Sequence, residues 1–180
     1  MIEVIDDCVP KELQDYFEII TLGNTNNIEV EPSVEFKCKY EPTAFTETSK
    51  PLSFKHVLKS SAESSNHLVN FSKVATTVMP SLQNILFARI FLTLPYRTKQ
   101  THHSPHVDLD FPHKSLIYYV NNSEGDTVFF EKDYETIIDK VSPKKGRAVI
   151  FDGLIPHAAG IPTDNPRCIV NYNLIWKTKN

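Results

Sequence analysis

Helical spacing of apolar residues marks the first half of the chain. Apolar side chains recur three or four positions apart between Leu13 and Ile20, and the same spacing returns over residues 66–78, which end before Pro80. A short third helix is expected over residues 54–60, with Ser53 as its N-cap. The pattern therefore predicts three helices in the amino-terminal half, with short extended pieces between them.

The second half of the chain has the pattern of a β-rich core. From residue 84 onward, short runs of β-branched, aromatic and other apolar residues alternate with turn residues. Helices first and strands later predict an α+β domain in which the amino-terminal helices brace one sheet of a β sandwich or barrel. We expect a single domain over residues 1–180, with a helical and extended support region at 1–83 and the β core at 84–180. The predicted strands cover residues 2–5, 85–94, 115–120, 127–132, 135–141, 147–152 and 168–176.

Composition and charge narrow the class of protein. The chain is 41% hydrophobic and 23% charged, as in soluble globular proteins, and no apolar run approaches the roughly 20 residues that cross a bilayer. The amino terminus lacks the pattern of a secretory signal, which predicts a cytoplasmic protein. With 19 Lys+Arg against 22 Asp+Glu the formal charge is −3, which argues against a nucleic-acid or membrane partner. Three cysteines without a C-x-x-C pair favour neither a disulfide framework nor a thiolate zinc site.

Three side chains have the chemistry of a metal site. His106 and Asp108 are two positions apart, so on a strand they point to the same face and can bind one ion together. His157 follows in a predicted loop between two strands, where a closed β core can bring it opposite that pair. Two histidines and one carboxylate are the facial triad of non-haem Fe(II) oxygenases, although H-x-D alone is more often a surface pair. Arg167, ten residues after His157, supplies a guanidinium that can bind a carboxylate through two hydrogen bonds.

Several motifs in the right order add to the triad. They are Tyr96, ten residues before His106, the strand Ile117-Tyr118-Tyr119-Val120-Asn121, the turn Glu124-Gly125-Asp126-Thr127, and the P-x-x-G-x-A-x-x-F pattern at residues 143–151. With these motifs, roughly residues 84–176 resemble the Fe(II)- and 2-oxoglutarate-dependent oxygenases, particularly the prolyl 4-hydroxylase-like branch. The turn at 124–127 departs from the family pattern, because one glycine of the usual pair is missing.

The resemblance implies a fold, an activity and cofactors. The fold would be a double-stranded β-helix, the jelly-roll core also found in cupins. The activity would be hydroxylation of a substrate, peptidyl proline by analogy, with conversion of 2-oxoglutarate to succinate and CO2. The cofactors would be Fe(II), 2-oxoglutarate and O2, with ascorbate as reductant.

The resemblance also assigns residues to 2-oxoglutarate. Tyr119 and Arg167 would bind its far carboxylate. Tyr96 would lie near the co-substrate, and Asn171, on the same strand face as Arg167, would line the pocket.

Two other functions fit the same residues. One is a non-catalytic β-barrel binding module that keeps the fold, with or without a structural metal. The other is a cupin-like metalloenzyme that does not use 2-oxoglutarate, for which Arg167 would be incidental. The substrate stays open between a peptide and a small molecule, and the amino-terminal half offers enough surface for a dimer.

Overall fold

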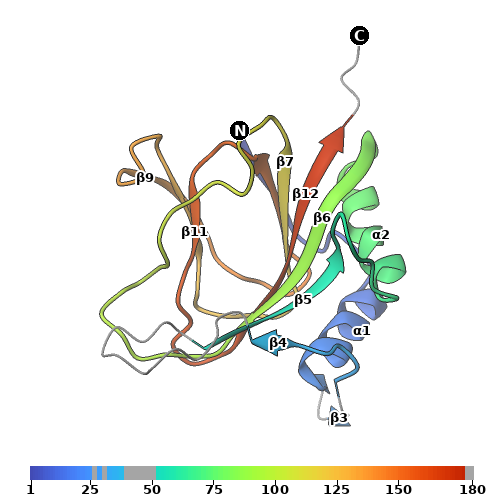
Figure 1. Cartoon of the computed structure of the whole chain (residues 1–180). Helices are drawn as coiled ribbons and strands as arrows, with labels where there is room; N and C mark the ends of the chain where they lie inside the picture. The colour runs from blue at the N-terminus through green and yellow to red at the C-terminus, as the bar shows by residue number, and fades with distance from the viewer. Residues whose placement is uncertain (26–27, 30–31, 39–51, 177–180) are drawn as a thin grey trace.

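A large and a small antiparallel sheet face each other in the computed structural model, which describes residues 1–25, 28–29, 32–38 and 52–176 (Figure 1). In spatial order, the seven-stranded sheet contains β1 (Ile2–Ile5), β10 (Ala148–Asp152), β7 (Lys114–Tyr119), β12 (Arg167–Trp176), β6 (Leu82–Thr93), β5 (Ser53–Lys59) and β4 (Lys37–Cys38). The small sheet contains β11 (His157–Ala159), β8 (Thr127–Phe130) and β9 (Ile137–Val141). A separate two-stranded ribbon pairs β2 (Asn24–Thr25) with β3 (Ile28–Glu29).

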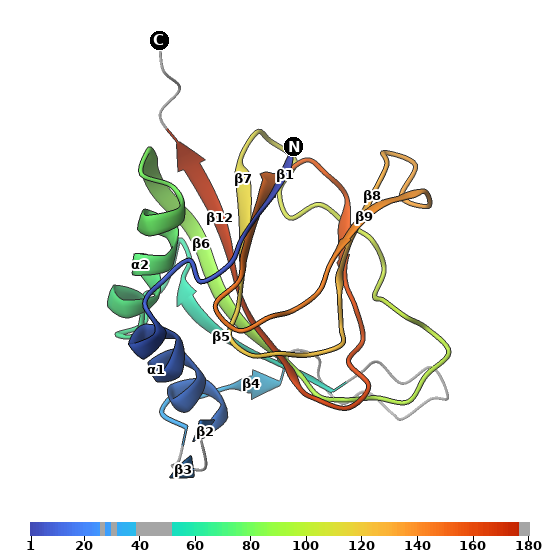
Figure 2. The same cartoon turned by 180° about the vertical axis from the view of Figure 1, so that it is seen from behind.

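Two helices, α1 (Lys11–Leu22) and α2 (Leu68–Val78), cover the outer face of the seven-stranded sheet (Figures 1 and 2). Phe17 of α1 stacks on Phe71 of α2, with ring centroids 4.2 Å apart, and both rings are fully buried. Burial of such a side chain stabilises a fold by roughly 1.5–3 kcal/mol. Helix α1 ends at Gly23, whose φ of 74° is the left-handed conformation that glycine adopts without a steric penalty. The helices therefore brace the sheet from one side, as the sequence predicts.

Strand β12 lies at the centre of the large sheet and is buried on both faces for most of its length. Its alternate residues Cys168, Val170, Tyr172 and Leu174 belong to the core beneath the helices. The residues between them therefore face the small sheet; these are Arg167, Ile169, Asn171 and Asn173. Polar side chains on β12 are thus directed into the space between the two sheets.

A second core fills part of that space. It joins side chains of the large sheet to Phe129 and Val141 of the small one. Just beyond the small sheet, isolated bridges pair His102 with Gly160 and His106 with His157, so residues 102–106 run antiparallel to β11. These bridges place residues 102–106, which are distant in the sequence, beside the strand that carries His157.

The structure confirms most of the predicted elements and corrects two. The helices near residues 13–20 and 66–78 and every predicted strand are present. Residues 54–60 were predicted as a helix, which is wrong, because Ser53–Lys59 pair with β6 as strand β5. The Ser53 hydroxyl lies 3.2 Å from the Thr93 hydroxyl across that pair instead of capping a helix. His157, predicted in a loop, begins the short strand β11.

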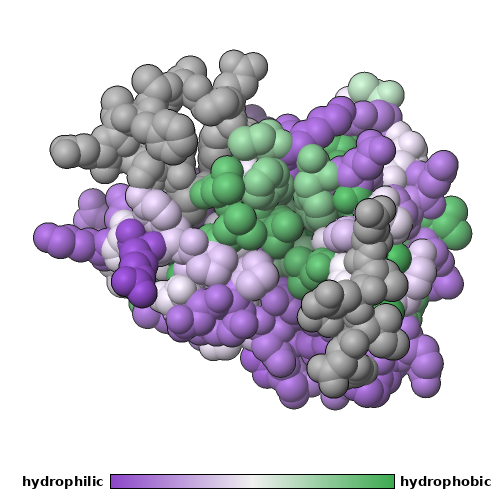
Figure 3. All heavy atoms as spheres, turned by 90° about the horizontal axis from the view of Figure 1, so that it is seen from below, coloured by the Kyte–Doolittle hydropathy of each residue, from purple (hydrophilic) through white to green (hydrophobic). Residues whose placement is uncertain are grey.

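An apolar pocket of about 460 Å3 opens on the helix side of the large sheet, where α1 and β6 end. Figure 3 shows apolar side chains gathered near the centre of the molecule's lower face, at this end. The pocket is lined by Thr21, Leu22, Pro32, Val34, Phe36, Leu92, Leu94 and Pro166. It shares no residue with the predicted metal site.

Within the described residues, neither helix has the length and apolar character that a membrane-spanning helix needs.

Candidate metal centre

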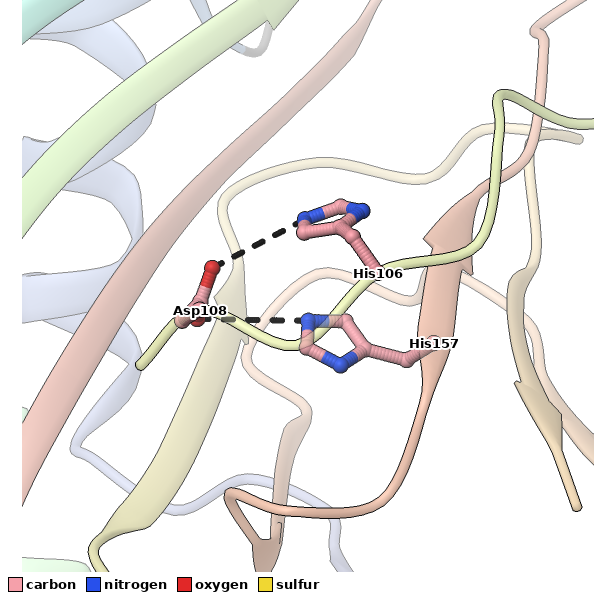
Figure 4. Close-up of side chains that lie close together, drawn as sticks. All are labelled: His106, Asp108 and His157. Carbon is pink, nitrogen blue, oxygen red and sulfur yellow. Dashed lines mark ion pairs between the residues drawn. The ribbon is translucent and has the colours of Figure 1, made fainter. Parts of the chain in front are cut away.

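His106, Asp108 and His157 meet between the sheets. Their ligand atoms all lie within 4.8 Å of one another. Nε2 of His106 is 3.7 Å from Oδ1 of Asp108, and Nε2 of His157 is 3.9 Å from Oδ2 of the same carboxylate. Figure 4 shows the carboxylate facing both imidazoles, with His106 and Asp108 on one chain segment and His157 on β11. The three side chains that the sequence singles out therefore converge on one point.

Backbone pairing explains how distant residues come together. His106 and His157 exchange reciprocal N–H to carbonyl hydrogen bonds of 3.0 and 2.9 Å. The expectation that His106 and Asp108 share a strand is not met, because His106 forms only an isolated bridge and the chain bends at Asp108. The bend turns the carboxylate toward the two imidazoles, so the pair converges without a regular strand.

Each imidazole presents Nε2 to the site because Nδ1 has another partner. Nδ1 of His106 lies 3.2 Å from the carbonyl oxygen of Ser104, and Nδ1 of His157 lies 3.1 Å from that of Ile155. With Nδ1–H donating to a carbonyl, the Nε2 lone pair is free to coordinate a metal. Burial lowers the pKa of His157, although the Asp108 charge opposes that shift, so the ring is neutral near pH 7. Two imidazole nitrogens and a carboxylate fit Fe(II), which accepts nitrogen and oxygen ligands.

Two amides hold the Asp108 carboxylate. Nδ2 of Asn171 and Nδ2 of Asn173 donate hydrogen bonds of 3.0 and 2.8 Å to the same oxygen, Oδ2. Burial alone raises the pKa of Asp108. The positive charge that His157 carries at acidic pH, together with the two amide bonds, outweighs burial, so the pKa of Asp108 lies below its ordinary value. Because both amides occupy Oδ2, Oδ1 is the oxygen better placed to bind a metal.

Loss of these amides is expected to weaken metal binding. Asn171→Ala and Asn173→Ala should each lower Mn(II) affinity by about 10-fold, and the double variant by about 100-fold, because outer hydrogen bonds orient a ligand carboxylate. Equilibrium titration of Mn(II), with the free ion followed by electron paramagnetic resonance, measures the change. Asn70→Ala, which removes a half-buried amide on α2 that donates to the Tyr16 hydroxyl, is the matched control. Wild-type affinity in the double variant would contradict this role.

A buried guanidinium lies on the same face of β12 as the two amides of the candidate metal centre. Arg167 is 2% exposed, and its Nε donates to the Gly125 carbonyl at 2.6 Å and its Nη2 to the Thr127 hydroxyl at 2.9 Å. The Thr127 hydroxyl is also 2.6 Å from the Tyr119 hydroxyl, and the Arg167 Cζ is 5.8 Å from the centre of the Tyr119 ring. Burial raises the pKa of Tyr119, so its hydroxyl stays protonated. Tyr119, Thr127 and Arg167 thus form one connected polar cluster.

Gly125 allows Arg167 to approach the turn this closely. A Cβ at position 125 would lie 2.9 Å from Cδ of Arg167 and 2.7 Å from the carbonyl oxygen of Gly160. The single glycine that remains in the turn is therefore at the position where close approach requires it.

Arg167 has no acidic partner within the described part of the chain. The ion pairs found there join other residues, and none includes this guanidinium. Burial lowers the pKa of Arg167, but an arginine remains charged at any physiological pH. A buried charge without a partner is costly, so the cluster of Tyr119, Thr127 and Arg167 is well suited to bind the carboxylate of a ligand.

The other predicted site residues have different outcomes. Asn171 lies at the site, but its amide contacts the Asp108 carboxylate of the candidate triad. Tyr96 is half-buried just beyond β6, and its backbone N–H donates to the Pro162 carbonyl at 3.1 Å; its role at the co-substrate stays a prediction. The sequence analysis missed Thr127 and Asn173. For Asn173 a signal exists, since it occupies the same face of β12 as Arg167 and Asn171.

Comparison with known proteins identifies the fold. No protein-family model and no curated protein matches the sequence. Among solved structures, a prolyl-4-hydroxylase from Pseudomonas putida aligns with a TM-score of 0.63 at 13% identity, covering 98% of this chain and 93% of that one. An oxidoreductase of the 2OG-Fe(II) oxygenase family from Burkholderia pseudomallei gives 0.68 at 10% identity, covering 96% and 84%. A viral collagen prolyl hydroxylase from Paramecium bursaria Chlorella virus-1, solved with 2-oxoglutarate, gives 0.55 at 14% identity, covering 96% and 94%. The chain therefore has the fold of these oxygenases.

Proposed function

We propose that this chain is an Fe(II)- and 2-oxoglutarate-dependent dioxygenase that hydroxylates a substrate and releases succinate and CO2. The observation that carries the proposal is the convergence of His106, Asp108 and His157. On the same face of β12 as the amides that hold Asp108 lies a buried Arg167 that has no acidic partner among the described residues. Similarity to solved 2OG-Fe(II) oxygenases supports it through the fold. We also infer that the two facing sheets form a double-stranded β-helix, because the similar structures belong to this class.

Each side chain has a defined task in this mechanism. His106, His157 and Oδ1 of Asp108 would hold Fe(II), which when bound supplies the redox chemistry that activates O2. Asn171 and Asn173 fix the orientation of the carboxylate. The His157 side chain is 5% exposed, whereas that of His106 is 54% exposed, so substrate reaches the site from the side of His106.

The co-substrate would be held on the buried side. Arg167 and the Tyr119 hydroxyl would bind the far carboxylate of 2-oxoglutarate, with Thr127 linking the two groups. Because these side chains are buried, water is excluded and the charged hydrogen bonds are strengthened. O2 completes the reaction, and ascorbate is the proposed reductant.

Anaerobic calorimetry tests the function directly. Titration of 2-oxoglutarate into Mn(II)-loaded protein should give binding that disappears when the metal is removed. Metal-independent binding, or none, would contradict the proposal and favour the non-catalytic binding module or the cupin-like enzyme. Succinate formation with Fe(II) in air then separates a turning-over enzyme from a module that only binds.

For the substrate we propose only a chemical class. Two of the similar solved proteins are named as prolyl hydroxylases, which makes a peptidyl proline the first substrate to test, and a small molecule the second. A cytoplasmic location and a dimer stay predictions from the sequence. Succinate production across peptide and small-metabolite panels is the measurement that identifies the substrate.

A further inference from the structure

The large sheet continues past the metal centre through β6 and β5 (Figure 1). In the β12–β6 register, Asn171 is opposite Arg89 and Asn173 is opposite Phe87. Residues directly opposite each other on antiparallel strands point to the same face, with Cα atoms about 4.5–5.5 Å apart. Arg89 therefore lies one strand away from the two amides that hold Asp108, on the same face of the sheet.

The Arg89 side chain is half-buried and held in place by an aromatic ring. Its Cζ lies 4.7 Å from the centre of the Phe87 ring, a cation–π contact that orients the guanidinium. Among the described residues, no carboxylate forms an ion pair with Arg89, and Asp108 itself pairs only with the two histidines. The donors of this oriented cation are therefore available to a ligand.

Lys55 adds a second positive charge on the same face. It is opposite Phe91 in the β5–β6 register, and Phe91 packs against the core between the sheets. On β5, Val57 is the residue directly opposite Arg89. Lys55 is therefore the diagonal neighbour of Arg89, at a backbone separation of roughly 7–8 Å. Both side chains are half-buried, in a chain whose formal charge is −3. They form a local positive site, which we call the β5–β6 cation pair.

A buried acceptor next to the cation pair also lacks a partner. Oδ1 of Asn171 is buried and receives no hydrogen bond, while Nδ2 of the same amide donates to Asp108. Buried acceptors are nearly always satisfied, so this oxygen calls for a donor at the same place. A substrate with an anionic group and a nearby N–H or O–H would satisfy both the cation pair and this acceptor.

We propose that Arg89 and Lys55 form a subsite for an anionic group of the substrate, a carboxylate or a phosphate. The subsite rests on the proposed function, since it would hold the substrate one strand away from the metal centre. It is separate from the cluster around Arg167, which lies four residues away from Asn171 along β12 and would bind 2-oxoglutarate. The proposed enzyme therefore prefers acidic substrates to their neutral counterparts.

Matched pairs of probes test the subsite. Blocked glutamate and blocked glutamine test for a carboxylate subsite (the carboxylate arm), and blocked phosphoserine and blocked serine test for a phosphate subsite (the phosphate arm). Each probe is titrated by calorimetry, without air, into protein loaded with Mn(II) and 2-oxoglutarate. We expect the anionic member of at least one arm to bind at least about 10-fold more tightly than its neutral partner. Arg89→Met should remove most of that preference, and Lys55→Met, the second variant, should reduce it.

Lys73→Met is the control, because Lys73 is exposed on α2, on the opposite side of the sheet. Equal binding of the charged and neutral probes in both arms would overturn the proposed subsite. An equal preference for the anionic probe in Arg89→Met and Lys73→Met would overturn it as well. Failure of the proposed function is seen separately, as loss of metal-dependent 2-oxoglutarate binding in the wild type. In that case the same titrations into protein without 2-oxoglutarate still decide whether the cation pair binds anions.

Discussion

Asp108→Ala is expected to lower the metal-dependent conversion of 2-oxoglutarate to succinate by more than about 100-fold. Removal of an outer hydrogen-bond partner of a metal ligand already costs about 10–100-fold, and this change removes the ligand itself. Asp108 is also the single acidic member of the cluster that the described residues form, so no neighbouring carboxylate there replaces it. Single-turnover succinate formation and Mn(II) titration measure the two consequences.

Two further variants make this result specific. Asp110→Ala removes an exposed carboxylate two residues away and should leave turnover unchanged. Asp108→Asn keeps an oxygen for the amides of Asn171 and Asn173, so it should fold normally and still lose turnover. Buried amide donors without an acceptor cost about 1–3 kcal/mol each, so the alanine variant should also unfold more easily. Undiminished turnover in both Asp108 variants would remove this residue from the mechanism.

The sequence predicts helices and strands correctly where the spacing of apolar residues fits only one kind of element. Residues 168–176 are apolar at nearly every second position and become a central strand, while the spacing between Leu13 and Ile20 becomes α1. Residues 54–60 were misread because Phe54, Val57 and Leu58 also fit helical spacing. The segment is a strand because it pairs with β6, and such a long-range contact leaves no signal in the local sequence.

The sequence predicts the candidate ligands of the site but not the hydrogen bonds that position them. Residue types and order were enough to select His106, Asp108, His157 and Arg167. The contacts that organise them join distant segments: Thr127 reaches Arg167 across the sheets, and Asn173 reaches Asp108 from β12. Hydroxyl and amide side chains are common throughout a sequence, so only the three-dimensional arrangement distinguishes these two residues.

Arg167→Met is expected to abolish the binding of 2-oxoglutarate while leaving the free protein nearly as stable as the wild type. Breaking a buried charge pair costs about 3–5 kcal/mol, which corresponds to a loss of affinity on the order of 100-fold or more. In the free protein the guanidinium is buried without an acidic partner among the described residues. Replacing such a charge by an apolar side chain of similar length is often neutral or stabilising, which offsets the lost hydrogen bonds to Gly125 and Thr127.

Thermal unfolding with and without ligand separates these two effects. At 2-oxoglutarate concentrations about 100 times the dissociation constant, the Mn(II)-loaded wild type should gain about 2.7 kcal/mol of stability, and Arg167→Met should gain almost none. Arg97→Met, at an exposed position in the loop after β6, should behave like the wild type. Arg167→Lys keeps the charge but loses the planar fork that reaches Gly125 and Thr127 together, so it should bind 2-oxoglutarate weakly. Equal ligand stabilisation of Arg167→Met and wild type would make Arg167 a structural residue and favour a metalloenzyme that does not use 2-oxoglutarate.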